Sequence, residues 1–200
     1  MRYFPVAIDT RNKTAVILGG GKVSTRKIKS LLDSELKFIV YALNFTDELV
    51  ILSKEYSKRI ELIETYISKN FCLLEADLLI IATNDKLLND YIELEANNKK
   101  IPYLRLDKKS NSSFILNKII TKNNFTFTIS TDSKLPFLTK IIEKDISTYL
   151  DNLDYEKIDL LIAIREKLIA KNLNTSEFLT SLCMKDKEEI RNYLESMDEN

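Results

Sequence analysis

The fold is indicated first by residues 14–24, which read Thr14-Ala-Val-Ile-Leu18 and then Gly19-Gly-Gly-Lys-Val-Ser24. The first part is an unbroken apolar run, which is typical of a strand buried on both faces of a parallel sheet. The chain has only three glycines, and all three follow this run. Apolar residues then recur at helical spacing, at Val23, Ile28, Leu31 and Leu32. The pattern predicts a strand, a glycine turn and a helix.

The glycine turn fits the phosphate-binding fingerprint of dinucleotide-binding domains. Gly19 would make the tight turn, Gly21 would let a pyrophosphate approach the backbone, and the small Ser24 takes the third position. Exposed N–H groups at the start of the helix, from Lys22 onward, would bind the phosphates. The alternative is a tight strand–helix connection that binds no ligand. The position of the motif between a buried strand and a helix favours nucleotide binding.

Strands and helices continue to alternate after this unit. Further strands are predicted at 37–43, 60–64, 77–83 and 101–107, with helices at 46–55 and 86–98. This alternation predicts an α/β fold: a doubly wound parallel sheet of the Rossmann type. Past residue 107 we expect two strands, at 113–120 and 125–131, and then helices at 135–150, 155–171, 175–183 and 185–196.

We therefore expect three parts in the chain. They are a dinucleotide-binding Rossmann domain at 1–110, a small strand region at 111–148 and a helical domain at 149–200. One helical stretch carries a broad apolar stripe, made of Leu160, Leu161, Ile164, Leu168 and Ile169. Such a stripe needs a partner surface, either a second copy of the chain or its own sheet domain.

Composition excludes several classes of protein. Thirty basic and thirty acidic side chains cancel, which argues against a nucleic-acid partner. The chain shows neither an apolar run long enough to span a membrane nor the layout of a signal peptide, so we expect a cytoplasmic protein with no membrane partner. Cys72 and Cys183 are interpreted as structural thiols of a reduced compartment. Because there is no histidine, acid–base chemistry falls to carboxylates, hydroxyls or lysines, and no resident metal site is predicted.

Polar residues follow three of the predicted strands, at the edge where open α/β sheets bind ligands. Asn44 stands where many dinucleotide-binding domains carry an acid for the ribose, so the choice between NAD and NADP stays open. Ala82-Thr-Asn-Asp85 ends a buried strand, and a loop cap is the alternative there. Asp107 ends the last strand of the series and is the best-placed base beside a cofactor, with a cap or turn residue as the alternative.

Together these residues resemble the precorrin-2 dehydrogenase family of siroheme synthesis, whose members are often also sirohydrochlorin ferrochelatases. The matching motifs run in order from residue 4 to about residue 150: Phe4-Pro5, Gly19-Gly-Gly-Lys-Val-Ser-Thr-Arg26-Lys27, Ala82-Thr-Asn-Asp85 with Asn89, Asp107 with Phe114, and Ile129-Ser-Thr131 with Pro136. The helical tail fits the C-terminal helical region of the family. The chain departs from the family pattern in the strand Tyr103-Leu-Arg-Leu106, which lacks the usual Asn, at Asn117 and in the turn at 132–136, all on the substrate side.

The resemblance implies a homodimer in which NAD+ takes a hydride from the tetrapyrrole precorrin-2. In bifunctional members Fe2+ then enters the product, sirohydrochlorin. By position, Asp107 matches the catalytic aspartate of the family and Thr131 a Ser or Thr of the substrate pocket. By position, the resemblance also implies that Lys22, Val23, Leu43, Asn44, Thr83 and Asn84 contact the cofactor, beside Gly19, Gly20 and Gly21 of the glycine turn.

Two questions about the substrate side stay open. Arg105, Lys108, Lys109 and Lys134 would suit a pocket for a substrate with many carboxylates, although solvated surface is the simpler interpretation. The functional alternative to a dehydrogenase is a non-catalytic sensor or carrier that binds NAD or a tetrapyrrole. A dedicated chelatase that binds NAD poorly is a third option.

Overall fold

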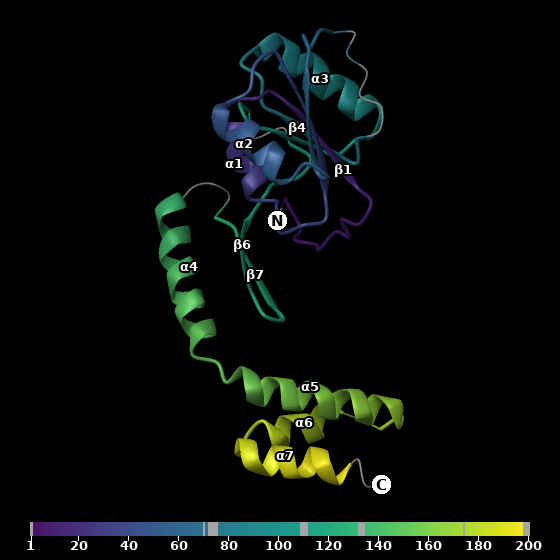
Figure 1. Cartoon of the computed structure of the whole chain (residues 1–200), viewed down its shortest axis with the longest axis vertical. Helices are drawn as coiled ribbons and strands as arrows, with labels where there is room; N and C mark the ends of the chain where they lie inside the picture. Colours follow the sequence, from purple (N-terminus) through teal and green to yellow (C-terminus); the bar gives the residue numbers. More distant parts are fainter. Residues whose placement is uncertain are drawn as a thin grey trace. The chain divides into compact units, whose positions relative to one another are not determined.

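The structure is a computed structural model that describes residues 2–69, 71, 76–108, 112–131, 135–173 and 175–197 (Figure 1). The chain divides into two compact units, residues 1–116 and residues 117–200. Among the described residues, no helix is both long and apolar enough to cross a membrane.

The first unit is a five-stranded parallel sheet in the order β3-β2-β1-β4-β5. Its strands are β1 (Thr14–Leu18), β2 (Lys37–Ala42), β3 (Ile60–Glu64), β4 (Leu78–Ile81) and β5 (Tyr103–Arg105). Its helices are α1 (Lys22–Lys29), α2 (Asp47–Glu55) and α3 (Lys86–Asn98). The strand order reverses between β1 and β4, which makes this the switch point of the sheet. The predicted Rossmann-type α/β fold is confirmed.

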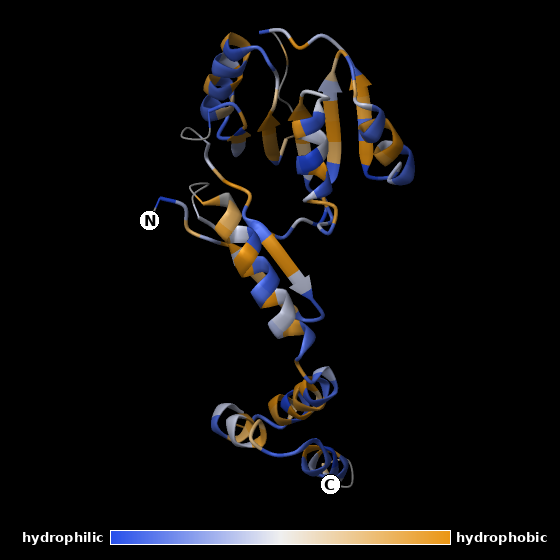
Figure 2. Ribbon diagram, turned by 90° about the vertical axis from the view of Figure 1, so that its left-hand side faces the viewer, coloured by the Kyte–Doolittle hydropathy of each residue, from blue (hydrophilic) through white to orange (hydrophobic). Residues whose placement is uncertain are grey.

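The sheet strands consist largely of hydrophobic residues, coloured orange in Figure 2, and both faces of the sheet are packed with apolar side chains. Along β1, Ala15 and Ile17 point to one face, where they pack with the buried side chains of α1 and α2. Val16 and Leu18 point to the other face and pack with α3. Both faces of β1 are therefore buried, because successive side chains of a strand alternate between faces. This burial fixes the glycine turn at the end of a rigid strand.

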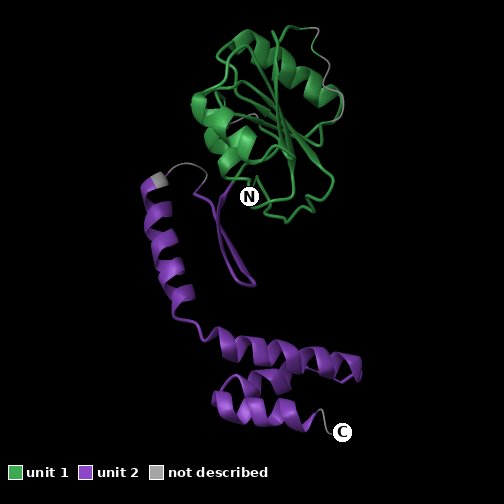
Figure 3. Cartoon of the chain, in the orientation of Figure 1, with its two compact units in different colours: residues 1–116 green, residues 117–200 purple. Residues whose placement is uncertain are grey.

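The second unit contains a hairpin, a long helix and a bundle of three helices, drawn in purple in Figure 3. Strands β6 (Lys118–Lys122) and β7 (Phe125–Ile129) pair antiparallel, and α4 (Pro136–Asp151) packs beside β6. The first of these strands was predicted at 113–120 and begins later. The reason is that Ser113 bonds back to β5, its N–H donating to the carbonyl of Tyr103 at 2.9 Å.

The last three helices form their own small core. They are α5 (Tyr155–Ala170), α6 (Ser176–Leu182) and α7 (Lys187–Ser196). The apolar stripe of α5 was expected to need a second copy of the chain or the sheet domain. Ile164 and Leu168 are instead buried against Leu182 of α6 and Ile190 of α7, so the tail supplies the partner surface itself.

Candidate active site

The glycine turn lies at the switch point, between the ends of β2 and β4. The N–H of Gly19 donates to the carbonyl of Tyr41 at 2.8 Å, and Gly19 has a φ of +118°. A Cβ on Gly19 would lie 2.5 Å from the backbone oxygen of Ala82, and one on Gly20 would overlap the backbone oxygen of Asn44. No described atom lies within 4 Å of the place where a Cβ on Gly21 would stand. The first two glycines therefore allow close packing, and the third faces open space.

Helix α1 begins directly after this turn and leaves its first N–H groups without helical partners. Gly21 is the N-cap and supplies no side chain, and the first N–H bonded back is that of Thr25, to the carbonyl of Gly21 at 3.1 Å. The first turn carries no acidic residue, and Lys22 and Val23 are exposed there. Free N–H groups at the positive end of a helix bind phosphate oxygens. The cradle that Gly21 leaves open therefore fits a dinucleotide pyrophosphate.

The residues after β2 form the neighbouring wall. Thr46 is the N-cap of α2, because its Oγ1 accepts from the N–H of Leu49 at 3.3 Å. The hydroxyls of Thr46 and Thr25 are 2.9 Å apart and join the starts of α1 and α2. Leu43 and Asn44 are both exposed at the strand end, beside the glycine turn.

The residues after β4 divide between a structural role and an open one. Asp85 caps α3 by accepting from the N–H groups of Leu87 and Leu88, each at 3.0 Å. A loop cap was the alternative interpretation of the segment 82–85, and Asp85 has this capping role. Thr83 bonds to the fully buried Asn89, with 2.5 Å between Thr83 Oγ1 and Asn89 Oδ1. Asn84 is exposed at the same strand end.

Asp107 follows β5 and is held by a charged pair. The guanidinium of Arg105 donates to both of its carboxylate oxygens, from Nε at 2.8 Å and from Nη2 at 3.0 Å. The Arg105 side chain is only 2% exposed, whereas that of Asp107 is 24% exposed. Arg105 was considered as part of a substrate-binding rim, and its burial rules out that role. Lys108 is exposed, and Lys109 and Lys134 lie outside the described residues.

The protonation state of Asp107 follows from these partners. The bonds from Arg105 lower the pKa of the Asp107 carboxyl, a side-chain bond from Asn89 lowers it further, and burial opposes both. The pKa of Arg105 is raised, first by its bonds to Asp107 and then by Asp90 and Glu93. At neutral pH, Asp107 is therefore an ionised carboxylate that can accept a proton.

Because the five strands are parallel, their carboxyl ends meet at one edge of the first unit. This edge carries Gly19, Gly20, Gly21, Lys22, Val23, Leu43, Asn44, Thr83, Asn84 and Asp107. Thr131 belongs to the second unit, where its hydroxyl lies 3.4 Å from that of Thr139. Sequence reasoning missed the contact of Arg105 with Asp107. The available signal was a charged residue inside an otherwise apolar strand, two positions before the aspartate.

Comparison with known proteins first defines the class. Residues 6–118 match the family model described as "Putative NAD(P)-binding". This match covers more than half of the 200 residues, and the chain belongs to this NAD(P)-binding family. The predicted cofactor class is thereby confirmed.

The relatives are more specific. The chain is 33% identical over 153 residues to the siroheme synthase of Blochmanniella pennsylvanica, covering 75% of this chain and 31% of that protein. It is 31% identical over 155 residues to the siroheme synthase of Buchnera aphidicola, covering 76% and 32%. The chain thus spans about a third of the length of these curated relatives. Among solved structures it resembles "SirC, precorrin-2 dehydrogenase", with a TM-score of 0.73 at 22% identity, over 98% of this chain and 100% of that one. The family match and the siroheme synthase relatives agree with the family resemblance that the motifs indicate, and the structural likeness shows the same fold.

Proposed function

We propose that this chain catalyses the NAD-dependent oxidation of precorrin-2 to sirohydrochlorin, a step of siroheme synthesis. One observation carries the proposal: a turn suited to a dinucleotide and an ionised Asp107 lie at the same edge of one sheet. The names of the relatives and of the structural neighbour support the choice of substrate.

The residues at this edge divide the work of binding and proton transfer. In this proposal, Gly21 and the N–H groups at Lys22 and Val23 hold the pyrophosphate, in the cradle described above. Gly19 and Gly20 shape the turn. Leu43 and Asn44 serve the adenosine ribose, and Thr83 and Asn84 line the cofactor at the end of β4.

The oxidation removes a hydride and a proton from the substrate. Bound NAD+ supplies the acceptor for the hydride. The Asp107 carboxylate accepts the proton on an oxygen lone pair that Arg105 does not occupy, and then releases it to water. In the second unit, Thr131 is proposed to contact the tetrapyrrole. Fe2+ would be a substrate of a second reaction, in which the macrocycle loses two N–H protons as the metal enters.

We also propose that the chain works as a homodimer through its second unit. Large apolar side chains of the hairpin and of α4 are exposed there: Ile119 at 46%, Phe137 at 65%, Ile141 at 53% and Tyr149 at 64%. Phe137 and Ile141 stand four positions apart and share one face of α4. A second copy of the same face would cover them, as in most symmetric oligomers. Light scattering on the purified chain tests this assembly.

An anaerobic assay tests the activity. The chain is incubated with enzymatically generated precorrin-2 and NAD+, and absorbance follows sirohydrochlorin and NADH, which should form in equal amounts. Asp107→Ala should lower the turnover at least about 100-fold, since a positioned base contributes that much or more. Its affinity for NAD+, measured by calorimetry, should stay near that of the wild type.

Asp9→Ala is the matched control, because Asp9 is an exposed aspartate that also pairs with an arginine two residues away. It should leave turnover unchanged. If Asp107→Ala kept the wild-type rate, the role assigned to Asp107 would be wrong. Binding of the tetrapyrrole without NADH formation would point instead to a sensor or carrier. Adding Fe2+ to the same mixture tests metal insertion.

A further inference from the structure

Arg105 is an unusual residue for its position. It lies on β5, its side chain is 2% exposed, and it carries a full positive charge. An unpaired guanidinium is costly to bury, because the charge loses its hydration by water. The chain avoids that cost with three carboxylates around one cation: Asp90 and Glu93 from α3, and Asp107 after β5. The proposed proton step uses Asp107 of this cluster and assigns no role to Arg105, Asp90 or Glu93.

Asp90 and Glu93 hold one end of the Arg105 guanidinium, and the other end of the guanidinium holds the Asp107 carboxylate. Nη1 of Arg105 donates to Asp90 Oδ1 at 2.5 Å and also to Glu93, so α3 anchors one end of the fork. Nε and Nη2 face Asp107 and engage both of its oxygens. A two-point bond between two planar groups fixes orientation as well as distance.

Asn89 joins Asp107 to the loop at the end of β4. Its side chain is fully buried, its Nδ2 donates to the backbone oxygen of Thr83 at 3.1 Å, and it also bonds to Asp107. The carboxylate is therefore held both from β5 and from the first turns of α3. Its position is set relative to the loop that carries Thr83 and Asn84.

We propose that Arg105 is a positioning residue for Asp107: its buried, two-point contact orients the carboxylate at the edge of the sheet. This inference rests on the proposed function and deepens it. Arg105 does not touch the reacting atoms. The charged and titratable groups around the pair are Asp90, Glu93, Tyr103 and Lys108, with the amide of Asn89 beside Asp107.

The test replaces the two-point fork while keeping the charge. Arg105→Lys retains a cation but cannot bond both oxygens in a fixed plane. We expect its turnover number to fall by about tenfold or more, because small misplacements of a catalytic group are costly. The KM for NAD+ should stay unchanged. The acidic limb of the pH–rate profile should move to higher pH, because the pKa of Asp107 rises when its bonds from Arg105 are lost.

A second measurement is independent of activity. Carbon-13 NMR of labelled aspartate, assigned with Asp107→Asn, follows the titration of Asp107 in the wild-type protein and in Arg105→Lys. An ordinary aspartate has a pKa near 3.9. Asp107 of the wild type should have a pKa below that value, and Asp107 of Arg105→Lys should have a pKa closer to it. Arg11→Lys is the matched control, because it breaks an exposed two-point pair with Asp9 and should shift only Asp9.

The outcomes separate the two hypotheses. If wild-type Asp107 titrates at or above the ordinary value, or if Arg105→Lys moves neither its titration nor the acidic limb, the positioning role is overturned. If Arg105→Lys does not fold, a wild-type Asp107 that titrates at or above the ordinary value still overturns the positioning role. If no NADH forms although Asp107 titrates low, the proposed function fails while the ionising effect of Arg105 stands.

Discussion

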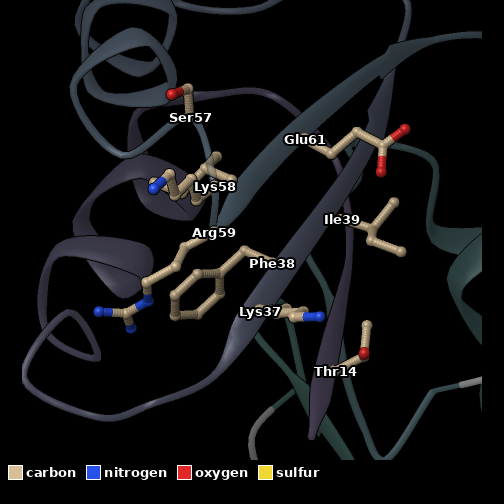
Figure 4. A pocket seen from close by; sticks show the side chains of 9 residues that line it. Thr14, Lys37, Phe38, Ile39, Ser57, Lys58, Arg59 and Glu61 are labelled. Atoms are coloured by element: carbon tan, nitrogen blue, oxygen red, sulfur yellow. The ribbon is translucent and has the colours of Figure 1, made fainter. Parts of the chain in front are cut away.

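The carboxyl ends and the amino ends of the parallel strands form two opposite edges of the five-stranded sheet. Both edges carry polar and charged groups, but these groups make different contacts. At the carboxyl edge, the turn at Gly21 and the start of α1 present backbone N–H groups that have no helical partner. At the amino edge, a hollow of about 250 Å³ is lined by Lys37, Lys58, Arg59 and Glu61, among other residues (Figure 4). Cationic side chains around a hollow are also typical of an anion-binding site. The hydrogen bonds of these side chains therefore decide whether this edge could bind a ligand.

At the amino edge, charged side chains form hydrogen bonds with backbone groups of the same unit. Arg59 donates to the carbonyls of Leu36 at 3.1 Å, Leu32 at 3.0 Å and Ser34 at 2.5 Å, and its guanidinium lies 5.9 Å from the ring of Phe38. Asp77 accepts from the N–H of Thr14 at 2.8 Å and from Lys13. Arg59 and Asp77 at this edge satisfy backbone groups, whereas the first N–H groups of α1 at the carboxyl edge have no helical partner.

The largest effect expected from this comparison is within the glycine turn. Gly20→Ala should destabilise the fold by about 3 kcal/mol or more, because its Cβ would overlap the backbone of Asn44 and press on Phe45. Gly21→Ala should change the free energy of unfolding by less than about 1 kcal/mol, because its Cβ meets open space. Urea denaturation measures both.

For NAD+ binding we expect the effect at Gly21→Ala, the variant whose stability should change little. Calorimetry on Gly21→Ala should show at least about tenfold weaker binding, equivalent to about 1.4 kcal/mol, since the methyl group would stand where the pyrophosphate approaches. Equal stability of the two variants, or wild-type NAD+ affinity in Gly21→Ala, would contradict this division of roles.

Much of the carboxyl edge could be predicted from sequence. The apolar run before Gly19 and the glycine spacing are local patterns, and a parallel sheet brings the ends of its strands together. The contacts of Arg105 could not be predicted, because they depend on which face of α3 meets β5. The partner of the α5 stripe was missed for the same reason: periodicity shows that Ile164 and Leu168 share an apolar face, but not which surface covers it.

A middle-sized effect is expected at the amino edge. Arg59→Ala should lower the free energy of unfolding by about 2 kcal/mol, because three carbonyls lose a charged donor. NAD+ affinity should not change. Lys58→Ala is the control: it removes the same charge from the exposed neighbour and should alter stability by less than about 0.5 kcal/mol. Weaker NAD+ binding in Arg59→Ala would mean that the two edges are not independent.

The smallest effect is expected at Asp77 and depends on pH. The bond from the Thr14 N–H, and then the contact with Lys13, lower the pKa of the Asp77 carboxyl in the folded chain. A lowered folded pKa adds stability that is complete above the unfolded value, near 3.9, and is lost as the pH falls through the folded pKa. Asp77→Asn keeps an oxygen for Thr14, removes the charge and replaces the oxygen that accepts from Lys13 with an NH2 group.

The variant should therefore be less stable than the wild type at pH 7, by less than about 1 kcal/mol, since the Asp77 side chain is 37% exposed and its pair with Lys13 is screened by solvent. Urea denaturation between about pH 2 and pH 7 should show this gap constant above about pH 5 and closing below about pH 4. At about 1 M salt the share due to Lys13 should shrink, while the share due to the Thr14 bond persists. If the difference in unfolding free energy did not vary with pH, the charge of Asp77 would contribute nothing to stability at this edge. Packing and uncharged hydrogen bonds alone would then stabilise it.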